Sequence, residues 1–245
     1  MNPAMSDVST PSNQFAEHIT PALLEVSEEA FFLQFELYLH FAKHLHVDVC
    51  DGAFVSSLTV PYIAAQTIAP NFFQQLDLKT IDTEVHLMVA DPHNVGCDFI
   101  RAGAKRIIAQ WESFHSAEEV RGVVDSWESR GAVVGLSILV PTDIEPLLAY
   151  VASDPRIVSM QIMSIDPIGM QGRPFDTRAI ARIKEVRARF PHLEISVDGS
   201  MNAQSIPVVL HAGATRTVVG SAVSKQPYPP EAYAALCKHV EKVMR

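Results

Sequence analysis

Two histidines and two aspartates alternate with apolar residues in three short segments of the chain. The segments read HVDVC, EVHLMV and ISVD, and the polar residues concerned are His46, Asp48, His86 and Asp198. Alternate side chains of a β-strand share one face, so each segment would separate its polar residues from its valines and leucines. Two imidazoles and two carboxylates that face one space form a site for Zn²⁺ or Fe²⁺, with Mn²⁺ and Co²⁺ as alternatives. The spacing therefore predicts one divalent metal ion, provided that the three strands converge.

These polar side chains must find partners if the fold buries them. A buried polar group without a partner is costly, and a lone buried histidine is more often a hydrogen-bonded structural residue than a metal ligand. Four such positions with one facing pattern favour a shared ligand. Cys50 falls on the same face as His46 and Asp48 and could act as a soft ligand, but a small buried apolar residue is its favoured role.

The three segments belong to a longer alternation of short β-rich stretches with stretches of helical period. In Ser116–Arg130 and Phe175–Phe190, for example, apolar residues recur every three or four positions, which is typical of helices. The predicted strands are His18–Leu24, His44–Val49, Thr83–Val89, Arg106–Trp111, Ala132–Leu139, Ile157–Met163, Glu194–Val197 and Thr215–Val219.

Eight strand–helix units in 245 residues predict an α/β protein with a single-domain (β/α)8 fold, the TIM barrel, which typically has about 250 residues. The rival fold, a doubly wound open sheet, would carry a glycine-rich fingerprint after its first strand, and none follows Leu24. Barrel enzymes place their chemistry at the C-terminal ends of the strands, where His46, Asp48 and Asp198 are expected to lie.

Boundaries follow from the composition of the connecting stretches. Residues 1–16 are rich in Ser, Asn and Pro and predict a flexible tail, which leaves residues 17–245 for the barrel domain. Three glycines predict helix ends and three prolines predict helix starts. These are Gly103, Gly131 and Gly213, and Pro61, Pro92 and Pro230.

The overall composition excludes several classes of protein. The formal net charge of −9 leaves no basic surface for broad nucleic-acid binding. No apolar stretch reaches the roughly 18 residues that a membrane helix needs, and the first residues lack the apolar core of a secretory signal. The three cysteines are an odd number and widely spaced, which favours reduced thiols in the cytoplasm over a disulfide framework.

Four sequence blocks resemble, in order and at matching separations, those of the ribulose-phosphate 3-epimerase family. They are HVDVCDG followed by FV and LT at residues 46–59, EVHLMV at 84–89, VDG at 197–199 and VGSA at 219–222. The corresponding family patterns read H-x-D-x-M-D-G-x-F-V-x-x-L-T, D-V-H-L-M-V, V-D-G-G and G-S-A. The resemblance extends from about His18 to Ser224.

The resemblance implies a (β/α)8 barrel that inverts C3 of a ketose phosphate through a cis-enediolate, with a divalent metal. Carried over by motif, His46, Asp48, His86 and Asp198 would bind the metal, and Asp48 and Asp198 would also form the acid–base pair. Epimerisation removes a proton from one face of C3 and delivers one to the other, which suits two carboxyls on opposite sides. The expected reaction interconverts D-ribulose 5-phosphate and D-xylulose 5-phosphate, and the family also implies a homo-oligomer.

The phosphate end of the substrate has candidates after the last two predicted strands. Barrel enzymes commonly bind phosphate there with backbone N–H groups, and Gly199, Ser200, Gly220 and Ser221 occupy these positions. Met88 and Met163 match two methionines that lie near the substrate in the family.

Several positions depart from the family pattern on the side that would face the substrate. Ala22 replaces a serine, Ser200 replaces the second glycine of V-D-G-G, and the loop Pro167–Phe175 is one residue longer, with its glycines redistributed. The preferred substrate could therefore be a close analogue, another pentulose phosphate or a hexulose 6-phosphate such as D-allulose 6-phosphate. Arg173 in this loop is either a phosphate ligand or a solvated surface residue.

Two other interpretations compete with the enzymatic one. Residues 77–82 read DLKTID and match D-x-K-x-x-D, the signature of orotidine-phosphate decarboxylases, but they precede the His86 strand and would lie at the wrong end of the barrel. A non-catalytic barrel that binds a ligand is the other alternative, motivated by Ala22 and the altered loop. The pair Asp48 and Asp198 argues against it, because inward carboxylates are costly without a function.

Overall fold

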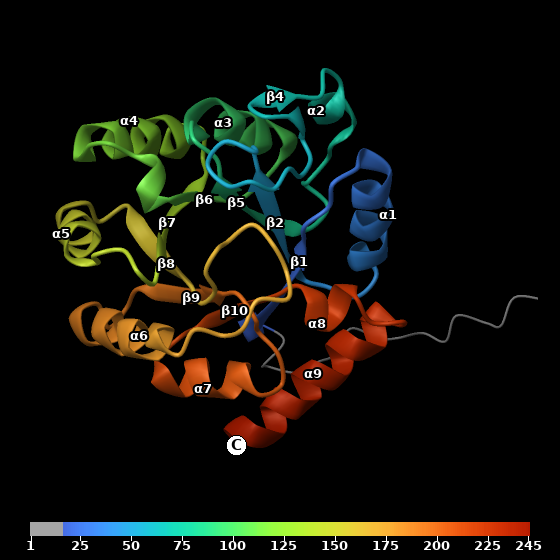
Figure 1. The fold of residues 1–245 in the computed structure, drawn as a ribbon, viewed down its shortest axis with the longest axis vertical. Coiled ribbons are helices and arrows are strands. Elements are labelled where there is room, and N and C mark those ends of the chain that lie inside the picture. Colours follow the sequence, from blue (N-terminus) through green and yellow to red (C-terminus); the bar gives the residue numbers. More distant parts are fainter. Residues whose placement is uncertain (1–16) are drawn as a thin grey trace, which may run out of the picture.

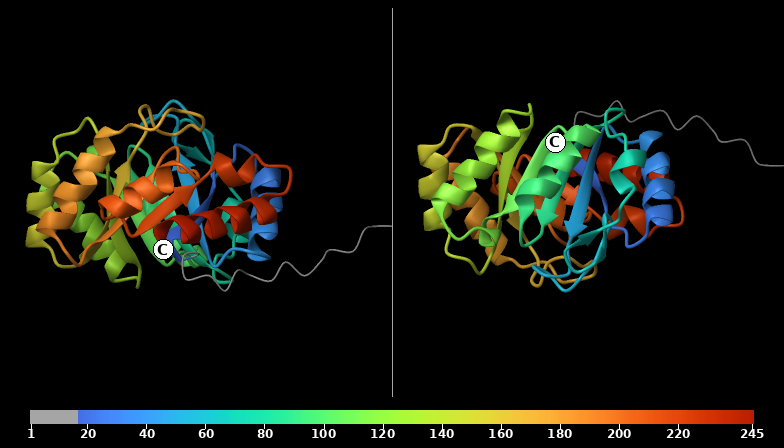
Figure 2. Two further views of the ribbon diagram at one scale, coloured as in Figure 1. Left: turned by 90° about the horizontal axis from the view of Figure 1, so that it is seen from below. Right: turned by 90° about the horizontal axis from the view of Figure 1, so that it is seen from above.

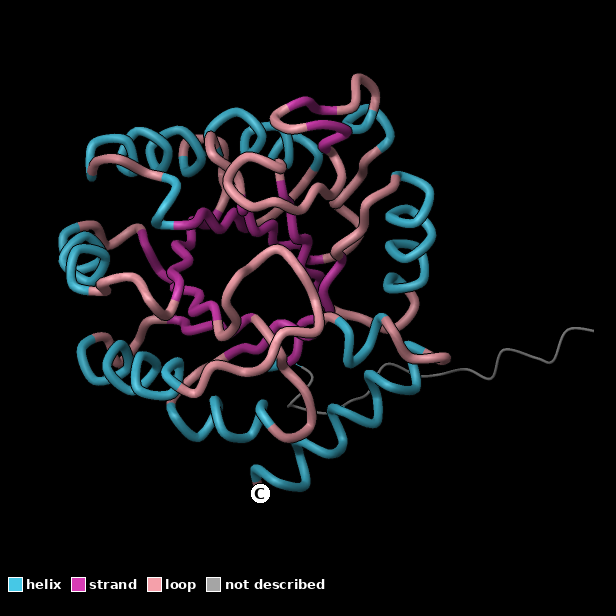
Figure 3. Tube along the Cα trace, in the orientation of Figure 1, coloured by secondary structure: helices cyan, strands magenta, loops and turns pink. Residues whose placement is uncertain are grey.

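Eight parallel strands close into a barrel at the centre of the structure, a computed structural model that describes residues 17–245 (Figure 3). The predicted tail over residues 1–16 lies outside the described residues. Around the barrel the strands follow the order β1-β10-β9-β8-β7-β6-β5-β2. They are β1 (Ile19–Leu23), β2 (His44–Cys50), β5 (Asp82–Met88), β6 (Arg106–Gln110), β7 (Val133–Leu139), β8 (Ile157–Met163), β9 (Glu194–Asp198) and β10 (Arg216–Val219). Each agrees with a predicted strand to within two residues, so the prediction of a (β/α)8 barrel is confirmed.

Helices surround this barrel on all sides (Figure 1). They are α1 (Glu28–Leu39), α3 (Pro92–Ala102), α4 (Ala117–Glu128), α5 (Glu145–Ser153), α6 (Arg178–Arg189), α7 (Ser205–Ala212), α8 (Ser221–Ser224) and α9 (Pro229–Met244). None of the helices in residues 17–245 is both long enough and apolar enough to cross a bilayer.

Local signals set the ends of several helices. The side chain of Asp91 accepts a hydrogen bond from the backbone N–H of His93, and Pro92 occupies the first turn of α3. The same helix ends at Gly103, whose φ of 110° lies in the left-handed region that glycine adopts without strain. In α4 the cap is Ser116. These ends agree with the sequence prediction.

The connection after β2 differs from the expected single helix. It contains a two-stranded hairpin, β3 (Tyr62–Ala64) and β4 (Thr67–Ile68), and a one-turn helix, α2 (Phe72–Gln75). Pro61 precedes β3, so the prediction that it begins a helix was wrong. A proline is compatible with the first turn of a helix but also with the residue before a strand, and the sequence pattern does not separate the two.

Apolar side chains between the strands and the helices form the main core. Val47, Val49, Val85 and Leu87 are buried there, as their alternation with polar residues predicted. The alternate positions of the same strands face the barrel interior, where Asp48 lies opposite His86 in the register of β2 and β5. Figure 2 shows that the loops after β2 and β8 project from one end of the barrel, which we call the mouth.

Candidate metal centre and active site

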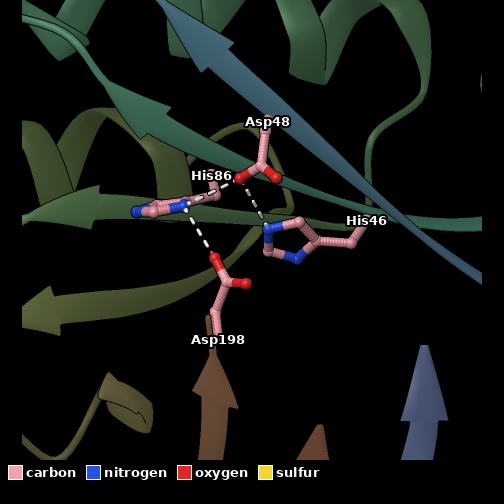
Figure 4. Close-up of side chains that lie close together, drawn as sticks. All are labelled: His46, Asp48, His86 and Asp198. Atoms are coloured by element: carbon pink, nitrogen blue, oxygen red, sulfur yellow. Dashed lines mark hydrogen bonds and ion pairs between the residues drawn. The ribbon is translucent and has the colours of Figure 1, made fainter. Parts of the chain in front are cut away.

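The four predicted ligands come together inside the barrel near its mouth (Figure 4). Each offers one nitrogen or oxygen atom, and these atoms all lie within 4.8 Å of one another. We call His46, Asp48, His86 and Asp198 the mouth cluster. Strand β2 supplies two of its members, and β5 and β9 supply one each. Because β1 and β10 lie between β2 and β9, Asp48 and Asp198 enter the cluster from different sides.

Hydrogen bonds within the mouth cluster centre on Asp48. Its Oδ1 lies 3.2 Å from Nε2 of His46 and 3.1 Å from Nδ1 of His86. Oδ2 of Asp198 lies 3.8 Å from the same Nδ1 of His86. Each imidazole thus turns one nitrogen toward the carboxylates, which is the arrangement in which the four groups could share a cation.

The two aspartates differ in protonation. Burial and the negative charge of Asp48 together raise the pKa of Asp198 well above its usual range. Burial acts in the same direction on Asp48, but His46 and His86 outweigh it and hold the pKa of this carboxyl well below its usual range. In the metal-free site Asp198 therefore holds its proton to a higher pH than Asp48 does, and the two form a pair whose environments push their pKa values apart.

The histidines also differ from each other. Burial alone would lower the pKa of His46, but Asp48 and Glu84 more than offset it and raise it to about 10. Burial lowers the pKa of His86, and its Nε2 has no hydrogen-bond partner among residues 17–245.

The donor set fits a divalent cation. It combines two imidazole nitrogens with two carboxylates, and positive charge at their centre would relieve the repulsion that raises the pKa of Asp198. The mouth cluster could therefore hold the metal that the sequence predicts.

A second group of charges lies below the mouth cluster, toward the N-terminal ends of the strands. We call it the floor cluster, and its members are Glu84, Arg106, Glu194 and Arg216. Oε2 of Glu84 lies 2.8 Å from Arg216 and 3.4 Å from Arg106, and both arginines also contact Glu194. Burial would raise the pKa of Glu84, but the arginines and His46 lower it to about 2.

Glu84 is the first residue of the segment EVHLMV, and the alternation that predicts an inward His86 also predicts an inward Glu84, to which the sequence pattern assigned no function. Its Oε1 lies 2.8 Å from Nδ1 of His46, so it touches a candidate ligand from below. The available signal was its position two residues before His86 on the same face of β5.

A pocket opens above the mouth cluster, and all six residues predicted to bind the substrate line it. These are Met88, Met163, Gly199, Ser200, Gly220 and Ser221. Asp48 and Asp198 form part of its base, and Ala22 also lines it. Gly199 has a φ of 113°, and a Cβ there would lie 2.8 Å from the side chain of Ile165. Glycine therefore allows the turn after β9 to pass close to the end of β8.

The loop after β8 lies across the mouth in Figure 1 (yellow-orange) and supplies further pocket residues. Arg173 is one of them, and its exposed guanidinium lies within 3.1 Å of Sδ of Met170. The hydroxyl of Ser200 donates a hydrogen bond to the backbone oxygen of Arg173 at 2.5 Å. Ser200 itself has a φ of 57°, so this bond accompanies a left-handed backbone that serine seldom adopts. The bond links the β9 turn to the loop.

Cys50 takes the apolar role rather than that of a ligand. It is fully buried and packs with Met88, Met163, Ile165 and Ile168, outside the group of atoms that could share a metal. None of the three cysteines, all of which lie in residues 17–245, forms a disulfide.

The D-x-K-x-x-D match lies at the opposite end of the barrel. Asp82 is the first residue of β5, whereas His86 and Met88 are near its other end. Asp77 and Lys79 are exposed before the strand begins. The motif therefore cannot contribute to the pocket at the mouth.

Comparisons with known proteins point to one family. Residues 19–224 match the sequence model of the "Ribulose-phosphate 3 epimerase family". A ribulose-phosphate 3-epimerase of Synechocystis is 32% identical over 199 residues, which cover 80% of this chain and 81% of the relative. The cytoplasmic isoform of rice (Oryza sativa subsp. japonica) is 29% identical over 203 residues, with coverage of 82% and 83%.

Solved structures share the fold at low sequence identity. KGPDC from Streptococcus mutans, solved as a ligand complex, has a TM-score of 0.72 and 8% identity, and the alignment covers 94% of this chain and all of that one. Orotidine 5'-monophosphate decarboxylase from Sulfolobus solfataricus has a TM-score of 0.60 and 11% identity, with coverage of 94% and 100%. These likenesses show the barrel, while the sequence matches show the family. The chain therefore belongs to the ribulose-phosphate 3-epimerase family of carbohydrate isomerases.

Proposed function

We propose that this protein is a metal-dependent epimerase that inverts C3 of a ketose phosphate. The observation that carries the proposal is the mouth cluster, in which one atom from each of two carboxyls and two imidazoles lies within 4.8 Å of the others and the two aspartates line the pocket. The proposed reaction interconverts D-ribulose 5-phosphate and D-xylulose 5-phosphate through a cis-enediolate. The four residues are the proposed ligands of one divalent cation, with Zn²⁺ or Fe²⁺ favoured over Mn²⁺ or Co²⁺.

Asp48 and Asp198 perform the proton transfers in this proposal. One carboxylate removes the proton from one face of C3, and the carboxyl of the other delivers a proton to the opposite face. Their entry from different sides of the barrel suits a substrate held between them. Their opposite pKa shifts in the metal-free site reflect different surroundings, which suit a pair with separate base and acid roles. When bound, a divalent cation supplies positive charge that stabilises the developing enediolate.

The remaining pocket residues orient the substrate. Backbone N–H groups of the turns at Gly199–Ser200 and Gly220–Ser221 are the proposed phosphate ligands, and Met88 and Met163 pack beside the carbon chain. Ala22 offers no hydroxyl to the substrate, and this favours a shift in preference among ketose phosphates, with D-allulose 6-phosphate as the second candidate.

The test is proton exchange at C3 in deuterated water. The protein is loaded with Zn²⁺ or Fe²⁺ and incubated with a panel of pentulose and hexulose phosphates, and incorporation of deuterium is followed by NMR. We expect exchange with at least one member of the panel, with D-ribulose 5-phosphate first. Exchange with none of them would favour the alternative of a non-catalytic, ligand-binding barrel.

A further inference from the structure

The contact between Glu84 and His46 can decide which ring nitrogen of His46 carries a proton, and this matters for metal binding. We propose that Glu84 is a positioning residue: it holds His46 in the tautomer whose Nε2 is free to bind the cation. The inference rests on the metal site of the proposed function and assigns a role to a residue outside the four ligands.

The imidazole of His46 lies between two carboxylates. Its Nδ1 is 2.8 Å from Oε1 of Glu84, and its Nε2 is 3.2 Å from Oδ1 of Asp48. The His46 ring is completely buried and Glu84 almost so, which leaves the ring no room to exchange its partners for water. Once a cation displaces the second proton, the imidazole is neutral and carries one proton. If Nδ1 donates that proton to Glu84, the lone pair of Nε2 points into the mouth cluster, as a ligand requires.

The floor cluster determines which oxygen of Glu84 faces His46. Arg216 and Arg106 both approach Oε2, at 2.8 and 3.4 Å. Arg216 is fixed in turn by Glu194 at 3.1 Å and by the hydroxyl of Thr20 at 3.0 Å. Because the guanidinium donors occupy Oε2, Oε1 is left as the acceptor for Nδ1 of His46.

Because of this arrangement, replacing the carboxylate of Glu84 with an amide tests directly whether Glu84 sets the tautomer of His46. In a Glu84→Gln variant the arginines can only donate, so the amide oxygen must take the place of Oε2 next to them. The amide nitrogen then takes the place of Oε1 and donates to Nδ1 of His46. The proton of the imidazole moves to Nε2, where it points at Asp48 and blocks the lone pair that the cation needs.

The experiment measures Zn²⁺ affinity by competition with a chromophoric chelator. Glu84→Gln should weaken Zn²⁺ binding about 10- to 100-fold, the range found for residues that orient metal-bound histidines. The matched control is Asp82→Asn, which makes the same carboxylate-to-amide change in a similar contact of 2.9 Å with His44 between the same two strands, outside the mouth cluster. Its affinity should stay within about twofold of the wild type. Equal affinities for Glu84→Gln and the wild type would overturn the inference.

A second measurement needs no variant and therefore does not depend on folding of Glu84→Gln. Two-bond ¹H–¹⁵N correlation spectra of the Zn²⁺-loaded wild type report which nitrogen of His46 carries the proton. We expect a protonated Nδ1 and a metal-bound Nε2, and a metal-bound Nδ1 would overturn the inference.

The inference and the proposed reaction can fail separately. Weakened Zn²⁺ binding by Glu84→Gln, together with no exchange at C3 for any ketose phosphate, would leave Glu84 as the positioning residue and refute the reaction. Exchange by the wild type, together with unchanged Zn²⁺ affinity in Glu84→Gln, would refute the role of Glu84 and leave the reaction intact.

Discussion

Two clusters of buried charge lie one above the other in this barrel, and they are balanced in different ways. The floor cluster pairs two carboxylates with two guanidiniums, and the pKa of Glu84 falls to about 2. The mouth cluster pairs two carboxylates with two imidazoles, and it retains protons: the pKa of His46 rises to about 10, and that of Asp198 rises above its usual range. Arginine always carries its charge, whereas imidazole and carboxyl groups gain or lose protons according to their surroundings.

This difference separates a structural role from a chemical one. A cluster with permanent counter-charges needs no further ligand, and it holds Glu84 and the strands β5, β6, β9 and β10 together. A cluster that is neutral only through bound protons can exchange them for a cation or pass them to a substrate. The same barrel thus keeps a fixed layer of charge beneath a layer that can react.

The largest expected effect concerns the acid–base role of the mouth cluster. Asp198→Asn removes one of the two groups that inversion at C3 needs, so the rate of epimerisation should fall by about 10²- to 10⁴-fold, although Asp48 alone could still exchange the proton on its own face. The measurement is conversion of one epimer into the other under saturating Zn²⁺ and substrate, with circular dichroism to show that the variant is folded. Undiminished epimerisation would remove Asp198 from the mechanism.

The floor cluster should instead affect stability. Arg216→Met leaves Glu84 without the partner 2.8 Å away, and breaking a buried ion pair in this way typically costs about 3–5 kcal/mol of unfolding free energy. Urea unfolding measures this loss. The control is Arg101→Met, which breaks an exposed ion pair of 2.8 Å with Asp98 and should cost no more than about 1 kcal/mol. Similar losses in both variants would contradict the structural role of the floor cluster.

The pH dependence of metal binding reports how many protons the mouth cluster releases when the cation binds. At pH 6 to 8 the metal-free His46 is protonated, because its pKa of about 10 lies above this range, and a cation at Nε2 must displace one proton. Zn²⁺ affinity should therefore rise at least about tenfold per pH unit, as chelator competition at several pH values will show. A slope of two protons would mean that Asp198 also gives up its proton when the cation binds, as an ionised ligand must. A slope of zero would exclude His46 as a ligand.

The smallest expected effect lies in the loop over the mouth. Arg173→Gln removes the guanidinium from the pocket lining, and exposed ion pairs contribute at most about 1 kcal/mol, so KM should rise by no more than about fivefold with kcat unchanged. Steady-state kinetics measure this change. Arg178→Gln is the control, because Arg178 is exposed, pairs with Asp176 and does not line the pocket. Identical KM values for both variants would mean that Arg173 is a solvated surface residue and not a phosphate ligand.

Much of the site could be predicted because its signals are local. The alternation in β2, β5 and β9 predicted that His46, Asp48, His86 and Asp198 face inward from their strands, and the family blocks pointed to the same four residues. The pairing of Glu84 with Arg106 and Arg216 could not be predicted in this way. It depends on the register and stagger of strands that are distant in sequence, and these are properties of the closed barrel. The hairpin after β2 was missed because short connecting segments carry little periodicity.

The sequence by itself determined the order of strands and helices, the inward face of each strand and the residue types available for chemistry, because these depend on neighbours a few positions apart. Only the tertiary structure decided which charges are permanently paired and which are left to bind protons. That division depends on distances of a few ångströms between side chains from different strands, and such distances exist only once the barrel has closed.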